Sequence, residues 1–380
     1  MNKQGPKTKK ILIVLTSLRA EGTPVLVLEL CRRWIAYGIE PRVVTLYPEP
    51  DDLGPEFQKL GVRIECLAVA DHGYLRYVKM FWGSYRISRE FKPDALLSMP
   101  LGRHTFFSYG AKLAGVAKIA AHVGNCPTDI LNKSFQKFRW LVQMGRPVVD
   151  VLICCSDYVR ENVMKCFGVT SSETVTIYNG CAVDKVADRA EFARRKKMNG
   201  KIIIGMVASL ELHKDQPTLI HAARLLKAQG IGFEVWLVGE GSRRSEYQSL
   251  ISELMLSDYV KLLGMRRDVP ELLGQMDIFV FSAKPDEGLG VALIEAMAAG
   301  VPVVASHVGA CREVLEEGLL GLLIPSQDPQ EMAGAILSTI NDPVAARFRA
   351  QQAKEKVSRV FTIEGMEKEY AACLGLSHDV

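Results

Sequence analysis

The chain has 380 residues, of which 48% are apolar and 24% charged, and its formal net charge is +4. One hydrophobic core rarely grows this large, so the length favours two domains with a cleft between them. The composition excludes a disordered, collagen-like or coiled-coil chain. The apolar run from Ile11 to Leu15 is far below the roughly 20 residues of a membrane helix, so we expect neither a transmembrane segment nor a secretion signal. Nine cysteines without a Cys-x-x-Cys pair favour a reduced, cytoplasmic location.

Short aliphatic runs alternate with helical patterns along the whole chain. Typical helices are expected at 23–37 and 156–167. Strands are expected at 11–16, 41–46, 62–67, 94–99, 117–122, 150–155, 201–208, 233–239, 258–264, 277–282 and 301–306. Near-continuous apolar strands joined by crossover helices indicate parallel sheets covered on both faces. The sequence therefore predicts an α/β chain of two Rossmann-like domains whose parallel sheets face each other across a cleft.

The strand rhythm breaks in a charged segment at 181–199, which we interpret as a hinge region. We therefore predict a first Rossmann-like domain at 1–183 and a second at 184–360. Thr362 is a good N-cap for a last helical pattern with no strand after it. Residues 361–380 are thus expected to form a C-terminal helix that packs back on the first domain.

Candidate chemistry concentrates in the segment KPDEGLGVALIEAMAAGVPVVAS, at 284–306. Glu287 ends a loop, two glycines follow it, and an apolar helix is expected from about Leu289 to Ala299. A helix N-terminus at the carboxyl end of a parallel strand offers free N–H groups and a positive dipole to a phosphate. Glu295 lies eight residues beyond Glu287, about 12 Å along a helix axis. Two carboxylates so far apart suit hydroxyl groups at opposite ends of a nucleotide sugar.

A purely structural alternative is that the Glu287 carboxylate stabilises a helix N-terminus, an interaction that contributes about 0.3 to 1 kcal/mol. It leaves Glu295 unexplained, because a carboxylate in an otherwise apolar helix needs a partner.

The E-x7-E spacing with the following AMAAGVPVVAS resembles the family 4 retaining glycosyltransferases of GT-B fold. Nearly the whole chain follows that family's order of landmarks, which are MVASLELHKDQPTLIHAARLL, WLVGEGSRR, the strand in VTIYNGCAVD, and VLELCRRWIAYGIEPRVVTL. The resemblance implies transfer of a sugar from a nucleotide-sugar donor to a glycan or lipid-linked saccharide of cell-surface polysaccharide synthesis. It also implies retention at the anomeric carbon. Since the chain contains no Asp-x-Asp, we expect no metal, and no cofactor beside the co-substrate.

The resemblance assigns roles to single residues. Glu287 would hold the donor-sugar hydroxyls, Lys214 would neutralise the leaving phosphate, and His122 would face the donor sugar. We take these three as the catalytic set. Glu295 would hold the ribose. The other expected donor-binding residues are Gly22, Ser209, Gly264, Met265, Arg266, Gly288, Leu289 and Gly290.

Two positions depart from the family pattern. Glu21-Gly22 stands where the family has paired glycines, and this puts a carboxylate at an anion site. Ser209 stands where the family has an arginine, so one cation is missing. The sequence offers four replacements without deciding between them: Arg243, Arg244, Arg266 and Arg103.

Charge is divided unevenly along the chain. Residues 1–190 carry 26 basic and 18 acidic side chains, whereas the remainder carries 21 and 25. Twelve of the basic residues lie between His72 and Arg146, interleaved with aromatic residues. We expect an anionic partner there, such as the inner surface of a membrane, although solvated helix faces would give the same pattern. No nucleic-acid-binding motif accompanies the charge.

Two other functions compete with transfer. A nucleotide-sugar epimerase of the same fold would bind the donor without an acceptor. A non-catalytic GT-B subunit would bind a partner enzyme or a membrane, and the losses at Glu21 and Ser209 leave room for it.

Overall fold

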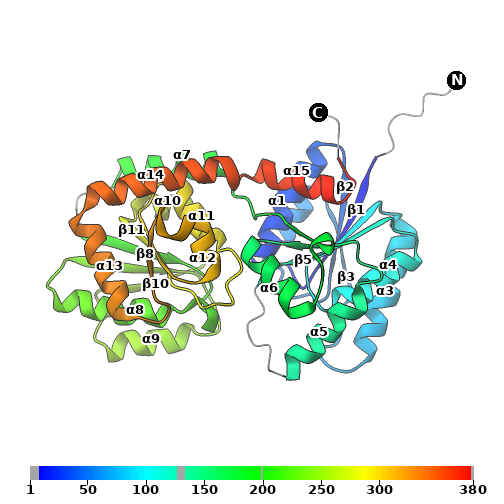
Figure 1. Ribbon diagram of the computed structural model, residues 1–380, viewed down its shortest axis with the longest axis horizontal. Coiled ribbons are helices and arrows are strands. Elements are labelled where there is room, and N and C mark those ends of the chain that lie inside the picture. Colours follow the sequence, from blue (N-terminus) through cyan, green and yellow to red (C-terminus); the bar gives the residue numbers. More distant parts are fainter. Residues whose placement is uncertain (1–7, 126–132, 198–199, 378–380) are drawn as a thin grey trace. The chain divides into compact units, whose positions relative to one another are not determined.

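The computed structural model describes residues 8–125, 133–197 and 200–377. Two compact units divide the chain (Figure 1): the first comprises Met1–Asn179 and Ile363–Val380, and the second Gly180–Thr362. Each unit has its own parallel sheet and its own buried apolar core. The two Rossmann-like domains expected from the strand and helix rhythm are thus confirmed.

The first unit contains a seven-stranded parallel sheet in the order β3-β2-β1-β4-β5-β6-β7. Its strands are β1 Lys10–Leu15, β2 Glu40–Thr45, β3 Arg63–Cys66, β4 Ala95–Ser98, β5 Lys118–Val123, β6 Val151–Cys154 and β7 Thr174–Thr176. All residues of β4 and β6 are buried, because helices cover both faces of the sheet. Six of the strands match the aliphatic runs to within two residues, and the short β7 overlaps only the start of the segment VTIYNGCAVD, in which the family resemblance places a strand.

Helices of the first unit are α1 Gly22–Ala36, α2 Gly54–Lys59, α3 Leu75–Phe91, α4 His104–Leu113, α5 Lys133–Gly145, α6 Asp157–Phe167 and α15 Ile363–Cys373. Ser156 caps α6 by accepting a hydrogen bond from the Val159 backbone N–H at 3.1 Å. The C-terminal helix α15 packs against α1, and Arg33 of α1 forms an ion pair with Glu364. No helix within the described ranges is both long and apolar enough to cross a bilayer.

The second unit contains a six-stranded parallel sheet in the order β10-β9-β8-β11-β12-β13. Its strands are β8 Ile202–Val207, β9 Phe233–Val238, β10 Val260–Gly264, β11 Ile278–Phe281, β12 Val303–Ser306 and β13 Leu322–Ile324. Its helices are α7 Val183–Arg195, α8 Gln216–Ala228, α9 Arg244–Glu253, α10 Val269–Gln275, α11 Val291–Ala298, α12 Gly309–Val314, α13 Pro329–Asn341 and α14 Pro343–Val360. Most of the segment expected to be a hinge region forms α7 instead, and α7 packs on α10.

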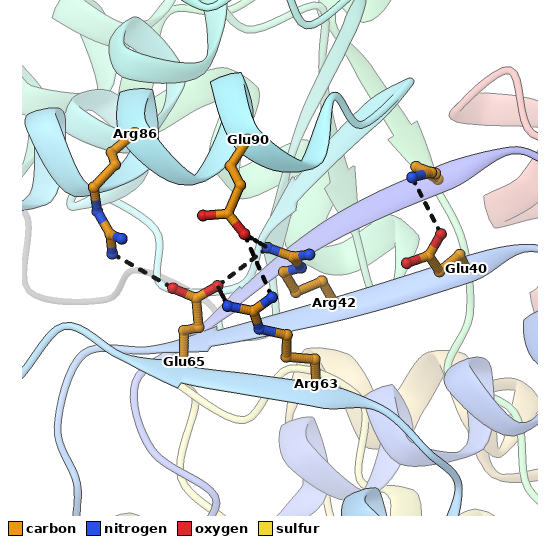
Figure 2. A network of polar contacts seen from close by, with 7 residues as sticks. Glu40, Arg42, Arg63, Glu65, Arg86 and Glu90 are labelled. Carbon is orange, nitrogen blue, oxygen red and sulfur yellow. Dashed lines mark hydrogen bonds and ion pairs between the residues drawn. The ribbon is translucent and has the colours of Figure 1, made fainter.

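A network of arginines and glutamates ties the edge of the first sheet to α3 (Figure 2). Arg42 of β2 lies between Glu65 of β3 and Glu90 of α3, with its Nη1 3.2 Å from a carboxylate oxygen of each. The Arg42 side chain is only 10% exposed, and its guanidinium lies 4.2 Å from the centroid of the Phe91 ring. Arg63, in contrast, contacts the same two carboxylates from a side chain that is 58% exposed. Arg42 is therefore the buried centre of the network.

We predict that Arg42→Ala lowers the free energy of unfolding by about 2 kcal/mol, because it removes charge-assisted hydrogen bonds from partly buried carboxylates. Arg63→Ala is the matched control and should cost about 0.5 kcal/mol or less, since its ion pairs are exposed to solvent. Urea denaturation of both variants measures the difference. Equal losses would contradict the central role of Arg42.

Candidate functional site

The strand order of the second sheet reverses between β8 and β11. The chain leaves β8 toward α8 and leaves β11 toward α11, so the connections diverge at the carboxyl edge of the sheet. Ligands of open parallel sheets bind at such a switch point. Lys214 follows β8 and Glu287 follows β11, and the topology alone therefore brings the two connections together.

Lys214 and Glu287 form an ion pair, with 2.5 Å between Lys214 Nζ and Glu287 Oε2. The two side chains are 19% and 8% exposed, respectively. The Lys214 ammonium also lies 5.9 Å from the centroid of the Phe281 ring. The structure thus joins two residues that the sequence places 73 positions apart. An anion that enters here would compete with the Glu287 carboxylate for Lys214.

Asp215 holds in place, through hydrogen bonds, the segment between β8 and α8 that carries Lys214. Its backbone is left-handed, with φ of 50°, and the residue is 5% exposed. Asp215 Oδ2 accepts hydrogen bonds from Thr218 Oγ1 of α8 at 2.9 Å and from Ser282 Oγ at 3.0 Å. Ser282 directly follows β11, so this carboxylate holds both connections. Sequence reasoning missed Asp215, and its position just before a helix that begins with Gln-Pro was the available signal.

The glycines after Glu287 let the chain turn sharply into α11. Gly290 has φ of 84°, and a Cβ there would lie 2.8 Å from Cζ of Phe281. The helix begins at Val291, two residues later than expected, so Gly288, Leu289 and Gly290 belong to the loop. The N-cap residue Gly290 has no side chain with which to cap the helix. Backbone N–H groups at a helix N-terminus of this kind suit an anion.

Glu295 lies in the middle of α11, away from the Lys214 pair along the helix. Burial raises the pKa of its carboxyl to about 7. No described side chain forms an ion pair with it. The sequence predicts a partner for the Glu295 carboxylate, but no cationic side chain in the described ranges supplies it. Hydroxyl groups of a ligand could donate hydrogen bonds to this carboxylate instead. Among the residues that the structure describes, no group of three His, Cys, Asp or Glu side chains is arranged to hold a metal ion.

Three arginines of the second unit were candidates for the cation missing at Ser209. Each is engaged by a neighbouring acid: Arg243 pairs with Glu246, Arg244 with Glu240 at 2.8 Å, and Arg266 with Asp268 at 2.6 Å. The Ser209 carbonyl accepts a hydrogen bond from Gln216 Nε2 at 2.7 Å. Lys214 is therefore the cation that the fold directs toward Glu287.

The turn after β10 carries three further expected donor-binding residues. Gly264 has φ of 71°, and its carbonyl accepts a hydrogen bond from the Gly239 N–H at 2.9 Å. The next two residues, Met265 and Arg266, are exposed. Their turn therefore presents backbone rather than a buried side-chain pocket.

In the first unit, Gly22 is the first residue of α1 and Glu21 is its N-cap. The unexpected carboxylate of Glu21 lies 3.3 Å from Arg19 Nη1, and the positive charge of that guanidinium partly offsets the negative charge at this helix N-terminus. Arg103, the fourth candidate cation, has its guanidinium 5.7 Å from the centroid of the Tyr47 ring.

His122 is the penultimate residue of β5 and is 2% exposed. Its Nδ1 lies 2.9 Å from the hydroxyl of Tyr370, which α15 supplies. Burial lowers the pKa of the imidazole to about 4, so the ring is neutral near pH 7. The packing of the C-terminal helix was expected from the sequence, but its hydrogen bond to His122 was not.

Comparisons with known proteins bear on the family and the fold of the chain. Residues 188–357 match the model of glycosyl transferases group 1, and residues 20–185 match that of Glycosyltransferase Family 4. The chain belongs to the family 4 type of glycosyltransferases. AmsK of Erwinia amylovora, an amylovoran biosynthesis glycosyltransferase, is 32% identical to this family 4 member over 42% of each chain. Glycogen synthase of Mycobacterium tuberculosis is 29% identical over 58% of this chain and 52% of its own.

This family 4 member spans about half the length of the curated relatives it matches. HepE of Anabaena, solved in complex with UDP and glucose, has a TM-score of 0.83 to it at 20% identity. That likeness covers 97% of this chain and 99% of HepE, and it shows the GT-B fold.

We predict that Glu295→Gln stabilises the protein more at pH 8 than at pH 5. The carboxyl titrates near 7 in the folded state and near 4.5 in the unfolded chain, so the folded state binds the proton more tightly. The contribution of the protonated Glu295 carboxyl to stability is therefore complete below about pH 4.5, and it is lost as the pH rises to about 7. The variant lacks this loss and should gain about 3 kcal/mol at pH 8. Urea unfolding at both pH values measures it, and equal effects would contradict the burial of the charge.

Proposed function

We propose that this chain transfers a sugar from a nucleotide-sugar donor to a glycan or lipid-linked saccharide of cell-surface polysaccharide synthesis. The observation that carries the proposal is the contact of Lys214 with Glu287 at the switch point of the second sheet. One cation and one hydroxyl acceptor then lie beside a helix N-terminus, which are the groups that a sugar diphosphate needs. The name of AmsK and the complex of HepE with UDP and glucose support the same reaction class.

In this proposal the second unit holds the donor. The diphosphate lies against the backbone at Gly288, Leu289 and Gly290, and Lys214 exchanges its carboxylate partner for a phosphate oxygen. Glu287, released from that pair, accepts hydrogen bonds from hydroxyls of the sugar. Glu295 accepts hydrogen bonds from the ribose, which its ionised form does best.

Lys214 has the main chemical role. Negative charge develops on the leaving diphosphate as the glycosidic bond breaks, and a nearby ammonium stabilises that charge more than it stabilises the bound substrate. His122 is neutral and contributes a hydrogen bond to the donor sugar rather than a proton transfer. Backbone groups of Gly264, Met265 and Arg266 border the nucleobase.

Two finer features of the reaction follow from the family resemblance. We propose retention at the anomeric carbon, with the leaving phosphate taking the acceptor proton. We also propose that no metal ion and no further cofactor is needed, because Lys214 supplies the positive charge that a divalent ion supplies in Asp-x-Asp enzymes.

Incubation with UDP-, GDP- and ADP-sugars, with and without saccharide acceptors, tests the proposed function. Transfer of the sugar, release of free nucleotide, and the donor's anomeric configuration in the product by NMR are expected, in the presence of a chelator. Isomerised donor without acceptor would identify an epimerase instead. Donor binding without turnover on any acceptor would identify a non-catalytic subunit.

We predict that Lys214→Ala lowers turnover by about 10²-fold, because a positioned cation is lost from the developing phosphate charge. Lys227→Ala, on the helix that follows Lys214, is the matched control, since the Lys227 ammonium donates to the Met255 carbonyl on the surface. It should keep wild-type turnover. Wild-type turnover of Lys214→Ala would remove Lys214 from the mechanism.

We also propose that the first unit docks on an anionic membrane surface on the cytoplasmic side. Three large apolar side chains stand along one face of α3 at helical spacing: Leu75 is 82% exposed, Val78 52% and Trp82 55%. The exposed residues Lys79 and Arg86 share that face. Apolar side chains beside cations suit a bilayer interface, where each basic residue adds about 1 kcal/mol.

We predict that the protein sediments with anionic vesicles at low salt, is released as salt is raised, and ignores neutral vesicles. The double variant Val78→Ser with Trp82→Ser should lose this binding. Phe348→Ser is the control, because Phe348 is an exposed aromatic residue of α14 in the second unit. A wild-type protein that stays in solution with anionic vesicles at low salt would overturn membrane docking.

A further inference from the structure

The C-terminal helix α15 supplies a residue to the buried interior of the first unit. Tyr370 is 0% exposed, and its hydroxyl lies 2.9 Å from Nδ1 of His122. The two residues are 248 positions apart, and the helix that carries Tyr370 packs beside α1 (Figure 1). A buried hydroxyl and a buried imidazole that meet in this way satisfy each other's hydrogen-bonding needs.

The other ring nitrogen of His122 points toward the carboxyl edge of the sheet. His122 is the penultimate residue of β5, and Gly124 is the first residue after that strand. A Cβ at position 124 would lie 3.1 Å from His122 Nε2. Because residue 124 is glycine, no side chain of that residue covers Nε2.

The chemistry of the pair decides which atom donates. A phenol is a better donor than acceptor, and an unprotonated imidazole nitrogen is a better acceptor than a phenol oxygen. Burial raises the pKa of Tyr370 and lowers that of His122, so both groups are neutral and one proton lies between them. Donation from the Tyr370 hydroxyl to Nδ1 leaves the ring proton on Nε2.

We propose that Tyr370 is a positioning residue that fixes His122 as the Nε2–H tautomer. Its hydroxyl holds the ring plane and aims one N–H donor at the sheet edge beside Gly124, toward an oxygen of the donor sugar. This inference rests on the proposed function, because His122 acts there on the sugar. The last helix of the chain then contributes to the site as well as to stability.

The anchoring of α15 supports a fixed position for Tyr370. The Arg33–Glu364 ion pair holds its first turn to α1. The side chains of Ile363, Met366, Leu374 and Leu376 are buried, and beyond the end of the helix Lys9 Nζ donates a hydrogen bond to the Gly375 carbonyl at 3.4 Å. Both ends of the helix are therefore attached to the first unit.

NMR of the full-length protein carrying ¹⁵N-histidine tests the tautomer directly, with His122→Gln used to assign the signal. The expected result is an unprotonated Nδ1 and a protonated Nε2. The hydrogen bond from Tyr370 should also change the ¹⁵N chemical shift of Nδ1. Tyr370→Phe should move that Nδ1 signal, whereas Tyr109→Phe should not. Tyr109 is the matched control, since its hydroxyl donates to the Met144 carbonyl at 3.0 Å in the same unit. A protonated Nδ1 in the wild type would overturn the proposal.

Kinetics then test whether Tyr370 acts through His122. Tyr370→Phe should lower kcat about tenfold, the scale of one hydrogen bond, with unchanged affinity for free nucleotide. In a His122→Gln background the same substitution should change kcat less than about twofold, because the residue through which it acts is gone. An equal loss in both backgrounds would assign Tyr370 a merely structural role. Absence of transfer by the wild type would refute the proposed function. The NMR result would still show whether Tyr370 donates a hydrogen bond to His122 Nδ1.

Discussion

The site depends on one ion pair, the contact of the Lys214 ammonium with the Glu287 carboxylate. Their side chains are mostly removed from water, so each charge would be costly without the other. In the proposed function this pair presets the donor site, because a cation and a hydroxyl acceptor are already gathered where two connections diverge. The proposal is that an incoming diphosphate replaces Glu287 at the ammonium, and that the freed carboxylate then accepts hydrogen bonds from hydroxyl groups.

The pair exists because the backbone around it is held. Asp215 accepts hydrogen bonds from hydroxyls of both connections, and Gly290 lets the chain turn close over the Phe281 ring. Helix α11 begins directly after this turn, so its N-terminus and the ion pair share one edge of the sheet. Local backbone conformation, a buried carboxylate and sheet topology act together in placing two side chains.

Local patterns made much of this fold predictable from the sequence. Strands buried on both faces are nearly continuous apolar runs, so β1 and β11 were found to within one residue. Strand β13 was missed because it has three residues and buries only Ile324, too little for a pattern. The segment around α7 was misread because its charged residues hide the small buried positions Ala190 and Ala193.

The candidate site was predictable only as residue types and spacing. The E-x7-E pattern located Glu287 and Glu295, and the family resemblance located Lys214. Contacts between distant parts of the chain carry no local signal, which is why the hydrogen bonds of Ser282 to Asp215 and of Tyr370 to His122 emerged only from the structure. Arg243, Arg244 and Arg266 are different, because the acid that engages each of them lies only two to four residues away and is visible in the sequence.

Calorimetric titration with free nucleoside diphosphate tests the central claim most directly, using wild type, Glu287→Gln and Lys214→Met. Exchange of partners at Lys214 predicts that Glu287→Gln binds the diphosphate at least as tightly as wild type, because its ammonium is released from the carboxylate. Lys214→Met should bind more than about tenfold more weakly, a loss of about 1.4 kcal/mol or more. Wild-type affinity in Lys214→Met would mean that the diphosphate binds elsewhere, and the account of this site would be wrong.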